Sequence, residues 1–106
     1  MHEPKLTHLQ FSILGYIAGG AASGKEIRAA LKRDGMRRSG PAFYQVMSRL
    51  EDAGWVKGDY RQQVIDGQII RERFYDLTPA GTRAQRLSAE FYSEWMRRLS
   101  HRPAPA

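Results

Sequence analysis

The segment GGAASGKE, Gly19 to Glu26, is the part of the sequence nearest to a motif with chemistry of its own. A glycine, four residues and then Gly-Lys match the phosphate loop of nucleoside-triphosphate-binding proteins in all but the last position. That position needs a serine or threonine hydroxyl for the magnesium ion, and here it holds Glu26, whose carboxylate repels phosphate. The preceding residues have the apolar spacing of a helix, whereas the motif follows a strand. We interpret the segment as the end of one helix and the start of another.

The other residues capable of catalysis or metal binding are isolated from one another. The chain has no cysteine, which excludes disulfides, thiolate zinc sites and cysteine nucleophiles. His2, His8 and His101 are far apart and have no carboxylates at ligand spacing. Three hydroxyl residues stand at predicted helix starts without a histidine base and are interpreted as capping residues: Ser23, Ser39 and Thr78. The sequence therefore predicts neither an enzyme nor a metal site nor a cofactor.

The charge balance points to a polyanionic partner. The 106 residues suffice for one domain, and 17 Lys and Arg against 11 Asp and Glu give a net charge of +6 and a pI near 10.1. This charge favours nucleic acid or an acidic membrane surface and by itself does not choose between them. No apolar run could span a bilayer, the start MHEPK lacks the features of a secretory signal, and the absence of cysteine suits a reducing compartment. We expect a soluble cytoplasmic protein without a membrane partner.

Capping signals divide the first half of the chain into three helices. A helix is predicted from about residue 7 to 18, because Thr7 and Gln10 form a capping box and two glycines follow. Ser23 and Glu26 repeat the capping box for a second helix, which ends near residues 34–35. A third helix, 39–53, begins at the N-cap Ser39 and has a predicted buried stripe at i, i+3, i+4 and i+7: Phe43, Val46, Met47 and Leu50.

A hairpin and a long helix follow. Asp66-Gly67 is a strong signal for a two-residue turn, and a hairpin centred on it pairs opposite charges, as at Lys57 and Asp76. Thr78 then caps a last helix with Pro79 in its first position. Its apolar residues form more surface than a lone domain of this size can cover and are expected to meet a second copy: Leu87, Phe91, Trp95, Met96 and Leu99.

These elements predict a fold that is mostly α with a small β-hairpin, of the α+β class. Three helices and a hairpin make a winged helix-turn-helix domain over residues 6–78. A C-terminal dimerisation helix at 79–100 and a flexible tail at 101–106 complete the chain. In such a domain helix 39–53 enters the major groove of DNA, and hairpin 55–77 is the wing.

The block FYDLTPAG, Phe74 to Gly81, is the most specific motif in the chain. A Tyr-x-Leu-Thr-x-x-Gly pattern after a hairpin is typical of winged-helix regulators, and other residues extend it: Gly24 to Ile27, Ser39, Phe43, Tyr44, Leu50, Glu51 and Gly54. With these residues the chain resembles, over about residues 6–85, the PadR family of bacterial transcriptional regulators; the block alone would also fit the MarR family. The resemblance implies a sequence-specific repressor that binds double-stranded DNA as a homodimer through a crossing C-terminal helix. It also implies release by a small aromatic effector.

The candidate DNA contacts come from two helix starts, the exposed face of helix 39–53 and the wing: Lys25, Arg37, Arg38, Ser39, Ala42, Tyr44, Gln45, Ser48, Arg49, Arg61 and Arg71. Arg37 and Arg38 precede a helix start whose free N–H groups favour phosphate. Gln45 stands where similar proteins often have proline and is a candidate for a bidentate contact with adenine. Arg73 is a weaker candidate, because it can stack on Tyr60 instead.

Two alternatives remain open at this point. Trp95, with Phe91 and Leu99, is either part of a dimer core or one wall of a pocket for a flat apolar effector. A winged helix can also be a protein–protein interaction module without DNA binding, since a fold does not determine a function. The basic residues beside helix 39–53 speak against that module, and the salt dependence of binding would discriminate the two.

Overall fold

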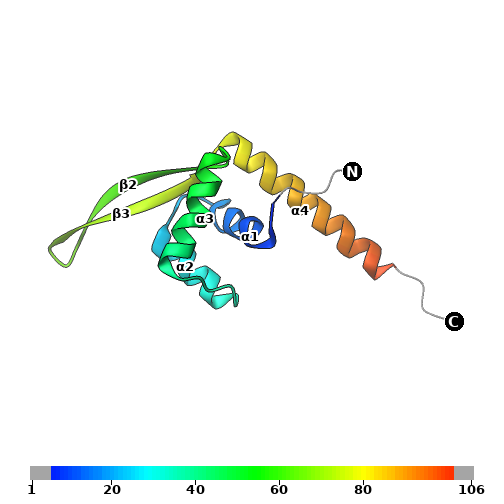
Figure 1. Cartoon of the computed structure of the whole chain (residues 1–106), viewed down its shortest axis with the longest axis horizontal. Coiled ribbons are helices and arrows are strands. Elements are labelled where there is room, and N and C mark those ends of the chain that lie inside the picture. Colours follow the sequence, from blue (N-terminus) through cyan, green and yellow to red (C-terminus); the bar gives the residue numbers. More distant parts are fainter. Residues whose placement is uncertain (1–5, 102–106) are drawn as a thin grey trace.

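The computed structural model of the chain describes residues 6–101, which form four helices and a three-stranded antiparallel sheet. In chain order the elements are α1 (His8–Ile17), β1 (Ala22–Ser23), α2 (Gly24–Arg33), α3 (Gly40–Asp52), β2 (Val56–Ile65), β3 (Gln68–Leu77) and α4 (Pro79–Ser100). In Figure 1, α1, α2 and α3 form a central body, from which the β2–β3 hairpin and α4 extend in opposite directions. The predicted winged helix-turn-helix architecture and α+β class are confirmed.

The helices begin where the capping residues indicate. Thr7 and Ser23 each accept the N–H of the residue three positions on, and the side chains of Gln10 and Glu26 accept the N–H of the caps in return. Thr78 is the N-cap of α4, and its hydroxyl also donates to the carbonyl oxygen of Gly54 at 2.5 Å. Thr78 thus ties the segment after α3 to the start of α4.

The hairpin has the predicted register. Lys57 lies opposite Asp76, and Val64 lies opposite Ile69. The φ angles of Asp66 and Gly67 are 52° and 77°, the positive values that a two-residue type I′ turn requires. Local turn chemistry therefore sets the alignment of two ten-residue strands.

A strand that the sequence did not indicate holds the hairpin against the helices. Ala22 and Ser23 of β1 pair with Tyr75 and Phe74 of β3, so the strand order is β1-β3-β2. Two residues cannot display the alternation by which strands are recognised. Because β1 directly precedes α2, the base of the hairpin is joined through backbone hydrogen bonds to the start of α2.

The core lies between α1, α2, α3 and the base of the sheet. Its buried members include Ile13, Leu14, Ile17, Ile27, Leu31, Phe43, Met47, Leu50, Val56 and Tyr75. Of the four residues predicted for the buried stripe of α3, Val46 is only partly buried and packs against the edge of this cluster. On the opposite face of α3, Tyr44, Gln45, Ser48 and Arg49 are exposed.

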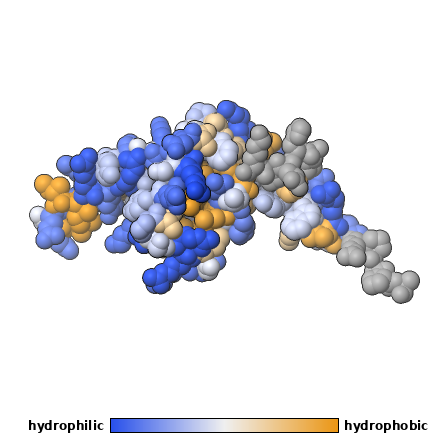
Figure 2. Space-filling view, viewed as in Figure 1, coloured by the Kyte–Doolittle hydropathy of each residue, from blue (hydrophilic) through white to orange (hydrophobic). Residues whose placement is uncertain are grey.

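α4 is covered by the rest of the chain only in part. The ring of Tyr92 packs 5.1 Å from that of Phe11 on α1, and Ser88 is buried. Four apolar side chains farther from the core are 45% to 64% exposed: Leu87, Trp95, Met96 and Leu99. Figure 2 shows apolar surface on the outer part of α4 and at the tip of the hairpin. Although α4 has 22 residues, neither it nor another helix of residues 6–101 is long and apolar enough to cross a membrane.

Candidate nucleic-acid interface

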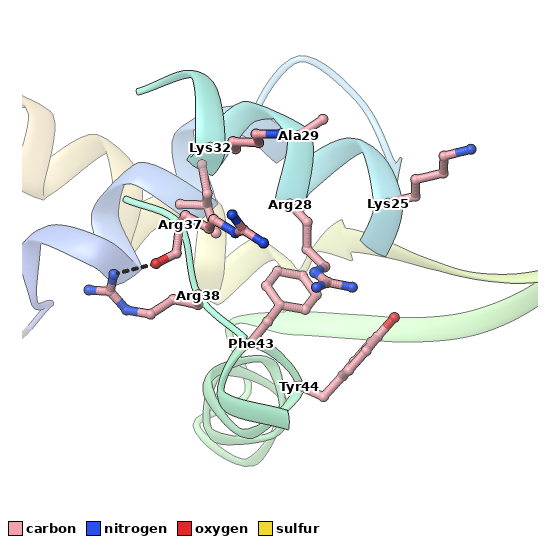
Figure 3. Close-up of a pocket in the computed structure, with 9 residues that line it drawn as sticks. Lys25, Arg28, Ala29, Lys32, Arg37, Arg38, Phe43 and Tyr44 are labelled. Atoms are coloured by element: carbon pink, nitrogen blue, oxygen red, sulfur yellow. Dashed lines mark hydrogen bonds between the residues drawn. The ribbon is translucent and has the colours of Figure 1, made fainter. Parts of the chain in front are cut away.

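A hollow of about 310 Å³ opens between α2, the segment that follows it and the first turn of α3 (Figure 3). We call it the basic hollow, because five of its nine lining residues are cationic: Lys25, Arg28, Lys32, Arg37 and Arg38. Its other lining residues are Ala29, Leu31, Phe43 and Tyr44. The structure thus brings together four of the predicted DNA contacts, which come from two helices and the segment between them.

None of the five cations of the basic hollow forms an ion pair within residues 6–101. Arg33, also on α2, differs in that its Nε lies 3.8 Å from Asp34 Oδ1. Uncompensated positive charge in a concave surface raises the local concentration of anions. The basic hollow is therefore suited to an anionic group such as a phosphate.

Sequence reasoning missed two members of the basic hollow, Arg28 and Lys32. Both follow Lys25 on α2 at three- and seven-residue spacing, which places the three on one helical face. This spacing is the feature of the sequence from which both residues could have been predicted to lie beside Lys25. The guanidinium of Arg28 lies 5.9 Å above the ring of Phe43 and about 4 Å from where a Cβ on Gly40 would stand. Arg28 is thus held against the first turn of α3.

Arg37 and Arg38 do not act alike. The guanidinium of Arg38 donates to the carbonyl oxygens of Met36 and Arg37 at 3.3 and 3.0 Å, so it braces the segment between α2 and α3. In Figure 3, Arg38 points away from Lys25, whereas the guanidinium of Arg37 lies between α2 and the start of α3. Arg37 is the better placed of the two to reach an anion in the basic hollow.

The start of α3 offers fewer N–H donors than expected. Pro41 has no N–H, and the N–H of Ala42 donates to the Ser39 hydroxyl at 3.3 Å. The N–H of Phe43 donates to the Ser39 carbonyl oxygen at 2.9 Å. Among the first-turn residues only Gly40 keeps an N–H without a partner in residues 6–101. Within residues 6–101 the first turn of α3 thus keeps one free N–H group, so an anion placed here would be held mainly by side chains.

Tyr44 links the basic hollow to the exposed face of α3. Its ring meets that of Phe43 edge-on with centroids 5.1 Å apart, and its hydroxyl lies over Gly24 at the start of α2. The side chain is 47% exposed. Beyond it, Gln45, Ser48 and Arg49 are exposed on the same side of the helix and do not line the basic hollow.

The wing arginines lie on the hairpin, apart from the basic hollow. Arg61 stacks 4.6 Å from the centroid of Phe74, and Arg71 stacks 4.4 Å from that of Tyr60. Both are exposed. Arg73 is different, because Glu51 of α3 accepts two hydrogen bonds from its guanidinium and thereby raises its pKa.

Histidine and carboxylate side chains do not gather into a metal site in the part of the chain that is described. Residues 6–101 contain no group of three or more His, Asp or Glu side chains that could hold a metal ion. His8 is the first residue of α1, and His101 directly follows the end of α4. His2 is outside the described residues. Residues 102–106 of the predicted flexible tail are also outside them.

Comparisons with known proteins identify the fold. No protein-family model matches the chain, and no curated protein matches it. A transcriptional regulator from Clostridium thermocellum superposes with a TM-score of 0.68 at 20% identity, over 88% of this chain and 87% of that one. A PadR family regulator from Clostridium difficile does so with a TM-score of 0.67 at 18% identity, over 88% and 98%.

A third solved structure is Bacillus subtilis PadR in complex with operator DNA. It superposes with a TM-score of 0.61 at 24% identity over 93% of this chain. This chain spans only 51% of the length of that one. The chain therefore has the winged-helix fold of the PadR-like regulators, as the FYDLTPAG motif indicated.

Proposed function

We propose that this chain is a sequence-specific transcriptional regulator that binds double-stranded DNA, with α3 in the major groove and the β2–β3 hairpin as the wing. The observation that carries the proposal is the basic hollow, whose five cations form no ion pair within residues 6–101 and adjoin the exposed face of α3. Phosphate contacts position a protein on a duplex, and side chains on a helix read base edges. The solved complex of Bacillus subtilis PadR with operator DNA supports this assignment.

The proposed regulator acts as a homodimer through α4. Four apolar side chains of this helix are about half exposed or more in a single copy: Leu87, Trp95, Met96 and Leu99. With Phe91, which is partly buried, they form the surface expected to meet the second copy. Two recognition helices then require two half-sites about one helical turn of DNA apart.

Repression and its relief complete the proposal. A dimer seated on a promoter excludes polymerase, and a flat aromatic compound between two copies of Trp95 would change the separation of the recognition helices. Because two fixed half-sites demand one separation, a ligand that favours another shape lowers DNA affinity. Trp95 is 45% exposed and thus accessible to such a compound in a single copy.

The function is tested by selecting bound duplexes from a random pool. The affinity for the selected duplex is then measured by mobility shift at several salt concentrations. We expect one enriched sequence with two half-sites and an affinity that falls steeply with salt through counterion release. No enrichment at any salt concentration would contradict the proposal. An apolar, salt-insensitive association with a protein would instead favour the interaction module.

The proposed effector site is tested by titrating the protein with flat aromatic compounds while tryptophan fluorescence is recorded. A Trp55→Phe variant leaves Trp95 as the one indole, because the chain has two tryptophans. Quenching accompanied by release from DNA is expected. If no compound quenches Trp95, or if Trp95→Ala merely abolishes the dimer, Trp95 belongs to the dimer core.

A further inference from the structure

One ion pair joins the recognition helix to the wing. Nη2 of Arg73, on β3, lies 3.1 Å from each carboxylate oxygen of Glu51, in the last turn of α3. The other three ion pairs of residues 6–101 connect positions no more than three apart in the sequence. The two side chains are 28% and 29% exposed, so water screens this pair less than a surface pair.

Strand β2 leaves space for this pair at Gly58. A Cβ on Gly58 would stand 2.7 Å from Nη2 of Arg73 and 2.8 Å from Oε1 of Glu51, so a side chain there would displace both groups. The guanidinium also lies 5.1 Å from the centroid of Tyr60 and 5.6 Å from that of Tyr75. These contacts restrict Arg73 to one orientation.

Tyr60 extends the arrangement along the wing. Its ring contacts the guanidinium of Arg73 and also that of Arg71, at 4.4 Å from the centroid. A continuous series of contacts therefore runs from Glu51 on α3 to the exposed Arg71. Arg71 forms no ion pair within residues 6–101, whereas the charge of Arg73 is compensated by Glu51.

We propose that Glu51 and Arg73 are positioning residues, which hold the wing and, through Tyr60, Arg71 at a fixed angle to α3. This inference rests on the proposed DNA binding. A duplex presents the recognition helix and the wing with sites at a fixed separation. A wing that is already held in place loses less conformational entropy on binding. Arg73 accordingly strengthens binding without contacting the phosphates.

The variant Glu51→Gln separates positioning from phosphate contact by the sign of its effect. It removes a negative charge beside a polyanion and frees the charge of Arg73, and both changes strengthen binding if Arg73 contacts phosphate. If the pair positions the wing, the variant weakens binding instead. We expect a loss of about fivefold on a duplex long enough to meet the wing.

Asp52→Asn is the matched control. Asp52 is exposed, lies one position further along α3 and forms no ion pair within residues 6–101. Its replacement removes the same charge and should leave affinity unchanged or slightly higher. A similar loss in both variants would show that any charge change at this end of α3 weakens binding, which would overturn the inference.

Two further measurements distinguish positioning from general stability. On a shorter duplex that ends before it reaches the wing, the Glu51→Gln variant should bind as well as the unaltered chain. The charge exchange Glu51→Arg with Arg73→Glu keeps the net charge and should regain part of the lost affinity. Stronger binding by Glu51→Gln, equal losses on both duplexes, or unfolding of both variants would overturn the inference. If the unaltered chain binds no duplex, the proposed function fails and the inference fails with it.

Discussion

Gly81, in the first turn of α4, lies directly against the backbone carbonyl group of Trp55. A Cβ on Gly81 would overlap the carbonyl oxygen and stand 2.8 Å from the carbonyl carbon. The same oxygen accepts the N–H of Thr78 at 3.1 Å, so this backbone cannot move aside without losing a hydrogen bond. The glycine of the FYDLTPAG motif thus sets how α4 leaves the winged domain.

Gly81→Ala should destabilise the protein by about 1–3 kcal/mol, because overpacking against backbone forces a shift of α4. Gly15→Ala is the control, since nothing lies within 4 Å of a Cβ at that position in α1. The control should stabilise the protein by about 0.5–1 kcal/mol through helix propensity. Urea unfolding measures both. Equal changes in the two variants would contradict the importance of the Trp55 contact.

Arg28→Ala should lower the affinity for all duplexes to a similar extent and reduce the dependence of log affinity on log salt by about one phosphate equivalent. Arg28 lines the basic hollow and is unpaired within residues 6–101. Arg33→Ala, on the same helix but paired with Asp34, should change the slope less. Mobility shift at several salt concentrations measures both slopes, and an unchanged slope for Arg28→Ala would remove this residue from the interface.

Gln45→Ala should weaken binding to the preferred site and leave binding to random duplex nearly unchanged. Gln45 is exposed on α3 outside the basic hollow, where it can reach a base edge. Loss of a bidentate base contact costs about 1–3 kcal/mol on the preferred site and little on random duplex. Competition between the two duplexes measures the difference. Equal losses on both would assign Gln45 to the DNA backbone.

Leu99→Lys should convert the dimer into a monomer with a mass near 12.1 kDa. Leu99 is 51% exposed in a single copy, and a charge placed there would have to be buried when two copies of α4 meet. Light scattering reports the mass. The affinity for DNA should fall when the dimer is lost. Arg98→Ala is a control on the same helix. A monomeric mass for the unaltered chain at micromolar concentration would contradict the proposed dimer.

The stability contributed by Tyr16 should begin to fall above about pH 10, the usual pKa of tyrosine. Burial and a hydrogen bond to Asp34 raise the pKa of Tyr16 to about 12. The folded state thus keeps the phenol protonated while the unfolded state ionises, so the contribution is complete below about pH 10 and lost as the pH rises through about 12. The free energies of unfolding of the unaltered chain and of Tyr16→Phe are measured from about pH 8 to 12. Their difference should be constant up to about pH 10 and narrow between about pH 10 and 12. A constant difference would show that Tyr16 ionises normally.

The sequence alone determined those features that depend on residues a few positions apart. Thr7, Ser23 and Thr78 begin their helices because a side-chain oxygen reaches an N–H three residues on. Asp66-Gly67 aligns the hairpin because both residues adopt positive φ. Such interactions are complete within one short segment, so the pattern of residue types is sufficient to predict them.

The tertiary structure decided which charges are free and which are compensated. The sequence separates Arg73 from Arg71 only by a possible contact with Tyr60, which both make. Arg73 also meets Glu51, which is 22 positions away. Arg28 belongs to the basic hollow because α3 packs beside α2, and the two residues of β1 form a strand because β3 lies alongside them. Each of these outcomes depends on which segments the core brings together, and burial of the apolar faces of all the helices at once determines that arrangement.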